Sequence, residues 1–241
     1  MKYAILIIVT NIASYENSDL KTGLWLSELT HVYSQFNEQG CEITIASPTG
    51  GMTPIDPESL KPLMLDQLSK KYWKEDDFQA LLQDTKSLKE VASKQYDVVY
   101  LTGGHGTMYD FPHNETLQKI LQAHFEKGKI VSAICHGVGG LLNVKLSNNE
   151  YLIKGKKVTG FNWFEESLAR RKNVVPFNLE KELKSRTNQY KKALFPMTSF
   201  VVVDDNIITG QNPFSSKEMA QVIYRELERK SNKSSRISLT F

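Results

Sequence analysis

Short apolar segments alternate with longer amphipathic ones along most of this chain, and this alternation narrows the folds that the chain can adopt. Residues 3–9, 97–101 and 129–133 are apolar runs of strand length, rich in Ile, Leu and Val. Between them, segments such as 24–36 and 115–125 carry apolar residues at helical spacing. Strands that alternate with helices form parallel sheets, because the chain needs a crossover to return to the same end of the sheet. The sequence therefore predicts an α/β protein with a mostly parallel sheet and helices on both faces.

Two segments interrupt this alternation. Residues 52–92 contain three prolines and short helical pieces, and we expect this segment and residues 176–195 to form a small cap-like insertion beside the sheet. One α/β domain then spans 1–228, followed by a polar, basic tail over 229–241 that we expect to be solvated. The remaining predicted elements are a strand over 42–46, a short strand over 157–159, a hairpin of 200–203 with 207–209, and a last helix over 219–227.

Charge and cysteine content exclude several classes of protein. Thirty Lys and Arg residues against 27 Asp and Glu residues give a net charge of +3, too balanced for a dedicated nucleic-acid binder. Two cysteines cannot cross-link a fold of 241 residues, and no Cys/His spacing typical of a metal site occurs. The apolar run 3–9 is shorter than the ~20 residues of a membrane span, and no signal-peptide cleavage site follows it. We expect a soluble, cytoplasmic protein that binds neither nucleic acid nor membranes.

The strongest candidate for chemistry is Cys135, which follows an apolar strand and precedes a glycine-rich segment in AICHGVGG. A nucleophile at such a strand-to-helix turn lies at the carboxyl edge of the sheet. The N-terminus of the following helix predicts a lowered thiol pKa, which favours the thiolate. Cys41 has no comparable polar neighbours and is expected to be structural. No histidine follows His136, so the base is His136 itself, a carboxylate or a histidine from the N-terminal half.

Two further segments are expected beside this cysteine. Gly104 and His105 follow the strand 97–101, and the backbone N–H groups of Gly104 and His136 are candidates to stabilise an oxyanion. We interpret His105 first as a substrate-pocket residue and last as a metal ligand; a cap of the turn and a phosphate-binding turn remain alternatives. Glu28 lies on the predicted first helix, and the sequence leaves open whether it is at the pocket edge or on the solvated face.

These segments together resemble the ThiJ/PfpI superfamily, and within it the heat-shock chaperone-like proteins that act as glutathione-independent glyoxalases (glyoxalase III). The motifs that carry the resemblance are KTGLWLSE at 21–28, TGGHGTMYDFP at 102–112, AICHG at 133–137, KVTGFNWFEE at 157–166 and IITGQNP at 207–213. Relatives have proline after CHG, whereas this chain has Val138 followed by two glycines. The resemblance implies a flavodoxin-like three-layer sandwich.

The resemblance also implies roles for individual residues. Cys135 would be the nucleophile, His136 its base, and Glu28 the carboxyl that hydrogen-bonds the sulfur. An acid after the TGF motif would orient His136, and spacing assigns it to Glu166, with Glu165 as the neighbouring alternative. The implied reaction converts methylglyoxal to lactate without a cofactor or a metal, and glyoxal and sugar adducts on proteins are further implied substrates. A homodimer and unfolded proteins are the implied partners.

Two other functions would use the same features. An exposed, easily oxidised Cys135 would also suit a stress-induced holding chaperone or redox sensor, in which Glu28 accepts a hydrogen bond from an oxidised sulfur. A cysteine peptidase or amidase would use the same strand-to-helix turn. The dependence of aggregation suppression on Cys135, and the hydrolysis of peptide or amide substrates, would separate these functions from a glyoxalase.

Overall fold

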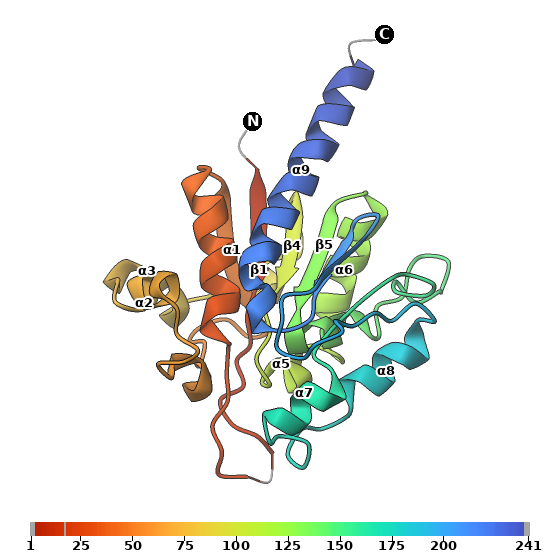
Figure 1. The fold of residues 1–241 in the computed structure, drawn as a ribbon. Coiled ribbons are helices and arrows are strands. Elements are labelled where there is room, and N and C mark those ends of the chain that lie inside the picture. The colour runs from red at the N-terminus through yellow and green to blue at the C-terminus, as the bar shows by residue number, and fades with distance from the viewer. Residues whose placement is uncertain (1–2, 17, 239–241) are drawn as a thin grey trace.

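The computed structural model describes residues 3–16 and 18–238, and its centre is a seven-stranded sheet (Figure 1). The strands lie in the order β3-β2-β1-β4-β5-β7-β6, and neighbours are parallel except for the antiparallel pair β6 and β7. This confirms the predicted mostly parallel α/β sandwich and the predicted C-terminal hairpin. The strands are β1 (Ala4–Ile8), β2 (Glu42–Ser47), β3 (Lys86–Ser87), β4 (Val98–Leu101), β5 (Ile130–Ile134), β6 (Val201–Asp204) and β7 (Ile207–Gly210).

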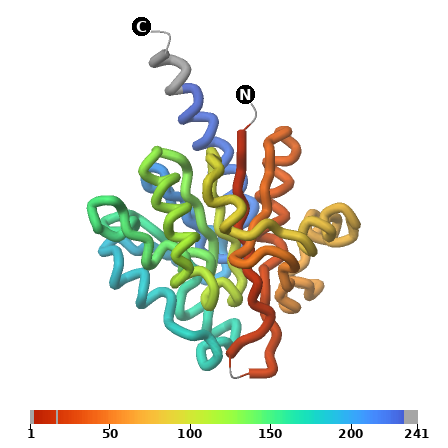
Figure 2. Tube along the Cα trace, turned by 180° about the vertical axis from the view of Figure 1, so that it is seen from behind, coloured from red at the N-terminus to blue at the C-terminus, as the bar shows by residue number. Residues whose placement is uncertain are grey.

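Helices cover both faces of this sheet. On one face α1 (Leu26–Glu38) lies beside α9 (Ser216–Ser238) (Figure 1). The rings of Phe36 and Tyr224 lie between these helices, with 6.0 Å between their centroids. Helix α6 (Glu115–Glu126) covers the other face, as the view from behind shows (Figure 2). Strands β4 and β5 are fully buried between these layers, which explains why their sequences are continuously apolar rather than alternating.

The cap-like segments contribute to the sheet as well as to the surface. Within 52–92 the chain forms short helices, and it then adds β3, which pairs with β2 and extends the sheet. Within 176–195 it forms α8. The remaining helices are η1 (Pro57–Leu60), α2 (Gln67–Trp73), α3 (Asp76–Gln83), α4 (Leu88–Val91), α5 (Thr107–Asp110), η2 (Cys135–Leu141), α7 (Trp163–Leu168), α8 (Leu179–Arg186) and η3 (Pro213–Ser215).

Two predicted elements differ from the structure. In place of the short strand predicted over 157–159, the structure has a single isolated bridge between Val158 and Tyr190. The last helix, predicted over 219–227, is longer: α9 continues to Ser238 and includes most of the polar tail, since the segment between Leu227 and Ser238 contains neither glycine nor proline to end a helix. Residues 239–241 of that tail lie outside the described residues. Among the helices of the described chain, none combines the length and the apolar character that crossing a membrane requires.

Candidate active site

Cys135 lies on a sharp turn directly after β5. Its φ angle is 56°, a left-handed conformation that few residues other than glycine adopt, and such strained residues are concentrated at functional sites. The chain then winds into the seven-residue 3₁₀ helix η2 instead of the expected α-helix. Gly137 requires the absence of a side chain, because a Cβ there would lie 2.0 Å from the carbonyl oxygen of Thr102. Cys135 is 2% exposed, at the carboxyl end of the sheet.

His136 connects this cysteine to an acidic residue. Its Nδ1 lies 3.3 Å from Sγ of Cys135, and its Nε2 lies 2.8 Å from Oε2 of Glu166. Glu166 projects from the first turn of α7, which follows the TGF segment. The arrangement is a buried thiol–imidazole–carboxylate chain, the geometry in which a carboxylate orients a general base toward a nucleophile.

The neighbouring acid, Glu165, points the other way. Its Oε1 accepts hydrogen bonds from the side-chain amides of Gln211 and Asn212 and from the N–H of Met197. Its Oε2 accepts from Asn162, which in turn caps α7. Of the two acids that the sequence left as alternatives, Glu166 is the one that faces His136, and Glu165 joins α7 to the loops before β6 and after β7.

His105 shares the same carboxylate. Its Nε2 lies 2.8 Å from Oε1 of Glu166, and its ring lies against that of His136 with 4.0 Å between centroids. Both histidines follow parallel strands, β4 and β5, whose carboxyl ends meet at one edge of the sheet. The sequence predicted that His105 would lie in the pocket. It did not predict one carboxylate between two imidazoles, which depends on side-chain directions that spacing does not reveal.

Glu28 lies neither at the pocket edge nor on the solvated face, the two positions that the sequence left open. It is completely buried on α1, and its Oε2 accepts a 2.7 Å hydrogen bond from the N–H of Gly103. Gly103 has to be glycine, because a Cβ there would lie 2.5 Å from Oε2 of Glu28 and 2.8 Å from Cβ of Cys135. The Glu28 carboxyl and the Cys135 thiol are close enough to shift each other's pKa.

The expected lowering of the thiol pKa is wrong for this geometry. Burial and the charge of Glu28 raise the pKa of Cys135 well above its usual range, and the N–H of His136 opposes them only in part. Burial likewise raises the pKa of Glu28 to about 8. The helix terminus is apparent in the sequence, whereas the burial of the thiol is not. At neutral pH both groups therefore hold their protons, and the thiolate forms only when a base accepts the thiol proton.

Glu166 and His105 have lowered pKa values, in contrast to Cys135 and Glu28. Burial raises the pKa of Glu166, but the neighbouring His136 and His105 outweigh burial and hold this pKa well below its usual range. The Glu166 carboxyl is therefore an anion. Burial, together with the charge of His136, lowers the pKa of His105. His105 is consequently a neutral imidazole at pH 7, beside an ionised carboxylate.

Gly104 takes up the backbone conformation that the turn after β4 requires. Its φ angle is 98°, and a Cβ there would lie 2.0 Å from the carbonyl oxygen of Gly23. The turn therefore packs directly on the chain that enters α1, which brings Glu28 and Cys135 together. The use of the Gly104 N–H as an oxyanion donor stays a prediction.

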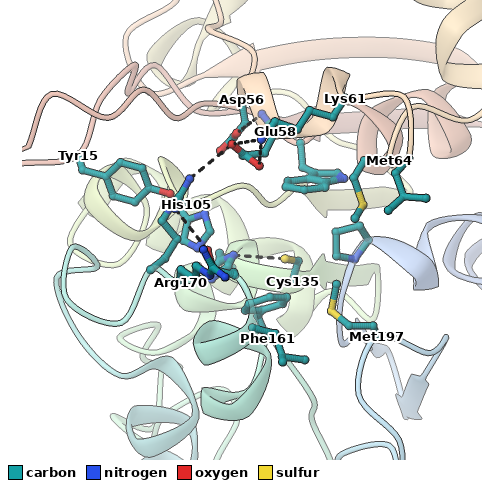
Figure 3. A pocket seen from close by; sticks show the side chains of 17 residues that line it. Tyr15, Asp56, Glu58, Lys61, Met64, His105, Cys135, Phe161, Arg170 and Met197 are labelled. Carbon is teal, nitrogen blue, oxygen red and sulfur yellow. Dashed lines mark hydrogen bonds and ion pairs between the residues drawn. The ribbon is translucent and has the colours of Figure 1, made fainter.

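A pocket of about 460 Å³ opens onto these groups. Cys135, His136, His105 and Phe161 line it, and Figure 3 shows Tyr15, Asp56 and Glu58 on another part of its wall. The other lining residues are Trp25, Lys61, Leu63, Met64, Leu168, Ala169, Arg170, Arg171, Met197 and Pro213. Five of the lining residues lie within 52–92, four more lie at the end of α7 or directly after it, and none lies within 176–195. Their individual roles were not predicted, because nothing in their local pattern marks a pocket.

Three charged residues on this wall form ion pairs with one another. Glu58 lies 2.8 Å from the Lys61 amine and 3.6 Å from the Arg171 guanidinium, which also lies over the ring of Tyr15. The nitrogens of His105 and His136 and an oxygen of Glu166 lie within 4.8 Å of one another, a grouping that could also hold a metal ion. In the described structure these atoms instead hydrogen-bond one another.

Comparisons with known proteins agree with this fold. The model of the DJ-1/PfpI family matches residues 20–226. Glyoxalase 3 of Candida albicans is 32% identical over 217 residues, covering 86% of this chain and 91% of its own. The crystal structure of glyoxalase III from Candida albicans has a TM-score of 0.86 at 30% identity and covers 92% of this chain and 96% of that one. A structure of the Rapid Encystment Protein 24 kDa of Francisella tularensis has a TM-score of 0.89 at 39% identity, covering 94% and 99%.

Proposed function

The chain belongs to the DJ-1/PfpI family, and we propose that it is a glutathione-independent glyoxalase that converts methylglyoxal to lactate through a hemithioacetal on Cys135. The observation that carries the proposal is the buried chain of Cys135, His136 and Glu166 at the base of a pocket, joined by contacts of 3.3 and 2.8 Å. The glyoxalases among its relatives support the same reaction. Sugar adducts on proteins are a second substrate class that this chemistry would serve after release of the aldehyde.

The first step is activation of the thiol. Because burial raises the pKa of Cys135, the thiolate must form in place, as His136 Nδ1 accepts the proton across 3.3 Å. The Glu166 carboxylate, 2.8 Å from Nε2, stabilises the resulting imidazolium. Sulfur then attacks the aldehyde carbon, C1, and the aldehyde oxygen becomes the oxyanion of a hemithioacetal while the thiol proton stays on His136. Backbone N–H groups of Gly104 and His136 would hold the developing oxyanion.

The second stage is an internal oxidation and reduction within the substrate. A proton leaves C1 and a proton arrives at C2, through an enediol, so that the ketone becomes an alcohol and C1 becomes a thioester. Water then cleaves the thioester, releasing lactate and the free thiol. No external oxidant, reductant or thiol enters, since Cys135 has the part that glutathione plays in other glyoxalases. A base in the pocket moves the proton between the two carbons.

The test is lactate production from methylglyoxal by the freshly reduced protein without glutathione, with Cys135→Ala beside it. We expect turnover in the wild type and its loss in the variant, because no other thiol lies at the pocket. Cys41→Ala is the matched control: Cys41 is buried away from the pocket lining, and we expect it to retain turnover. Absence of lactate from the wild type would overturn the proposal. Cleavage of peptides or amides in its place would favour a peptidase.

A further inference from the structure

His136 has both nitrogens engaged in activating the thiol. Nδ1 faces Sγ of Cys135, and Nε2 faces Glu166. After the thiol has lost its proton, His136 is an imidazolium with a proton on each nitrogen, and it has no lone pair with which to accept another. The proton on C1 of the hemithioacetal therefore needs a different acceptor unless His136 first gives its own proton away.

His105, unlike the His136 imidazolium, is a neutral ring that can accept a proton. Its hydrogen bond to Glu166 uses Nε2, and among the described residues Nδ1 has no hydrogen-bond partner. A neutral imidazole that donates from Nε2 carries its lone pair on Nδ1. Burial and His136 lower the pKa of His105, so the ring is neutral at pH 7. His105 is only 5% exposed, and it lines the pocket beside Cys135 and His136 (Figure 3).

Glu166 couples these two bases. Each of its oxygens lies 2.8 Å from one histidine, and the rings lie 4.0 Å apart between centroids. If its only task were to orient His136, a single histidine would suffice. One anion between two imidazoles stabilises positive charge on either ring, so it suits a reaction in which the two are protonated at different steps.

We propose that His105 is a second catalytic base, which removes the proton from C1 of the hemithioacetal and returns it to C2. This inference rests on the proposed glyoxalase function and divides its proton transfers between the two rings. Nδ1 of His105 takes the C1 proton, the C1–H electron pair forms the C1–C2 double bond, and the ketone oxygen takes the former thiol proton from His136, which gives an enediolate with its charge on the C1 oxygen. His105 then returns its proton to C2 while the C1 oxyanion becomes the carbonyl of the thioester, so that both histidines end neutral. Atoms and electrons balance without a co-reactant.

The test uses His105→Gln. A glutamine amide can reach the position of Nε2 and keep the hydrogen bond to Glu166, but it offers no base in place of Nδ1. Three quantities are measured: kcat for lactate, the rate at which iodoacetamide alkylates Cys135, and the isotope effect on kcat with methylglyoxal deuterated at C1. We expect kcat to fall about 100-fold, the usual contribution of a general base. We expect alkylation to be unchanged, and the isotope effect to rise because C1–H cleavage becomes the slowest step.

The matched control is His31→Gln. His31 is also hydrogen-bonded to a carboxylate through Nε2, at 2.7 Å from Asp66, but it lies outside the pocket, and we expect all three quantities to stay at wild-type values. A His105→Gln enzyme with wild-type turnover would overturn the inference. So would a parallel loss of turnover and alkylation with no change in the isotope effect, because His105 would then only position its neighbours. Failure of the proposed glyoxalase function would look different from failure of the His105 inference, because the wild-type protein itself would then make no lactate.

Discussion

Three glutamates surround the reacting sulfur, and their environments give them three different states. Glu28 is buried without a cation, and burial raises its pKa to about 8. Glu166 lies between two imidazoles that lower its pKa, although burial opposes them. Glu165 is surrounded by amide and backbone donors that join α7 to the loops around the final hairpin. The same side chain thus serves as a neutral acid, an anion and a structural acceptor, according to what lies next to it.

The raised pKa of Glu28 predicts how stability changes with pH. The folded protein keeps a proton on Glu28 up to about pH 8, whereas the unfolded chain releases it near 4.5. The free energy of unfolding should therefore decrease as pH rises from 4.5 to 8, with a contribution from Glu28 of the order of 5 kcal/mol. Glu28→Gln cannot titrate, so this contribution should disappear. Urea unfolding of both proteins at several pH values in this window measures the difference.

A second buried acid makes that comparison necessary. Burial also raises the pKa of Asp110, to about 7, and its effect on stability has the same sign. Asp110 is present in both proteins, so the difference between their pH curves isolates Glu28. Parallel curves for wild type and Glu28→Gln would show that Glu28 is ionised in the folded state.

At the scale of elements, the site depends on two turns that pack against each other. The turn after β4 contains Gly103 and Gly104, and the turn after β5 contains Cys135 and Gly137. The second turn lies against the carbonyl oxygen of Thr102 at the end of β4. Backbone contact between the turns, with no side chain between them, sets how far Cys135 lies from Glu28.

Two alanine substitutions in η2 test this contact. A Cβ at Gly137 would lie 2.0 Å from a backbone oxygen that cannot move alone, and overpacking of this kind costs about 1–3 kcal/mol or more. A Cβ at Gly139 would meet only side-chain atoms at 3.7 Å or beyond, which is ordinary contact distance. We expect Gly137→Ala to lower the free energy of unfolding and to reduce lactate production, and Gly139→Ala to leave both near wild type. Urea unfolding and turnover measure the outcome, and equal effects of the two substitutions would contradict it.

At the scale of the whole molecule, the features that could be predicted are those that follow from chain order. Apolar runs located β1, β4 and β5, and parallel pairing then required Cys135 and His105 to meet at one edge. The burial of Glu28 and the raised thiol pKa were not predictable, because they depend on how α1 packs behind the sheet. The extension of α9 to Ser238 was missed for another reason: its polar, basic sequence suggested a solvated tail after the helix, although it contains no helix-breaking residue.

The residues of the site are synthesised at different times, so the site is assembled in stages as the chain leaves the ribosome. Cys135 and His136 precede Glu166 by about thirty residues, and β7, which flanks the strand that bears the cysteine, follows more than seventy residues after it. A nascent chain that ends before α7 contains the thiol without the carboxylate that orients its base. Reactivity toward aldehydes should therefore arise only once the C-terminal third has joined the sheet, so that an unfinished chain carries an unactivated thiol.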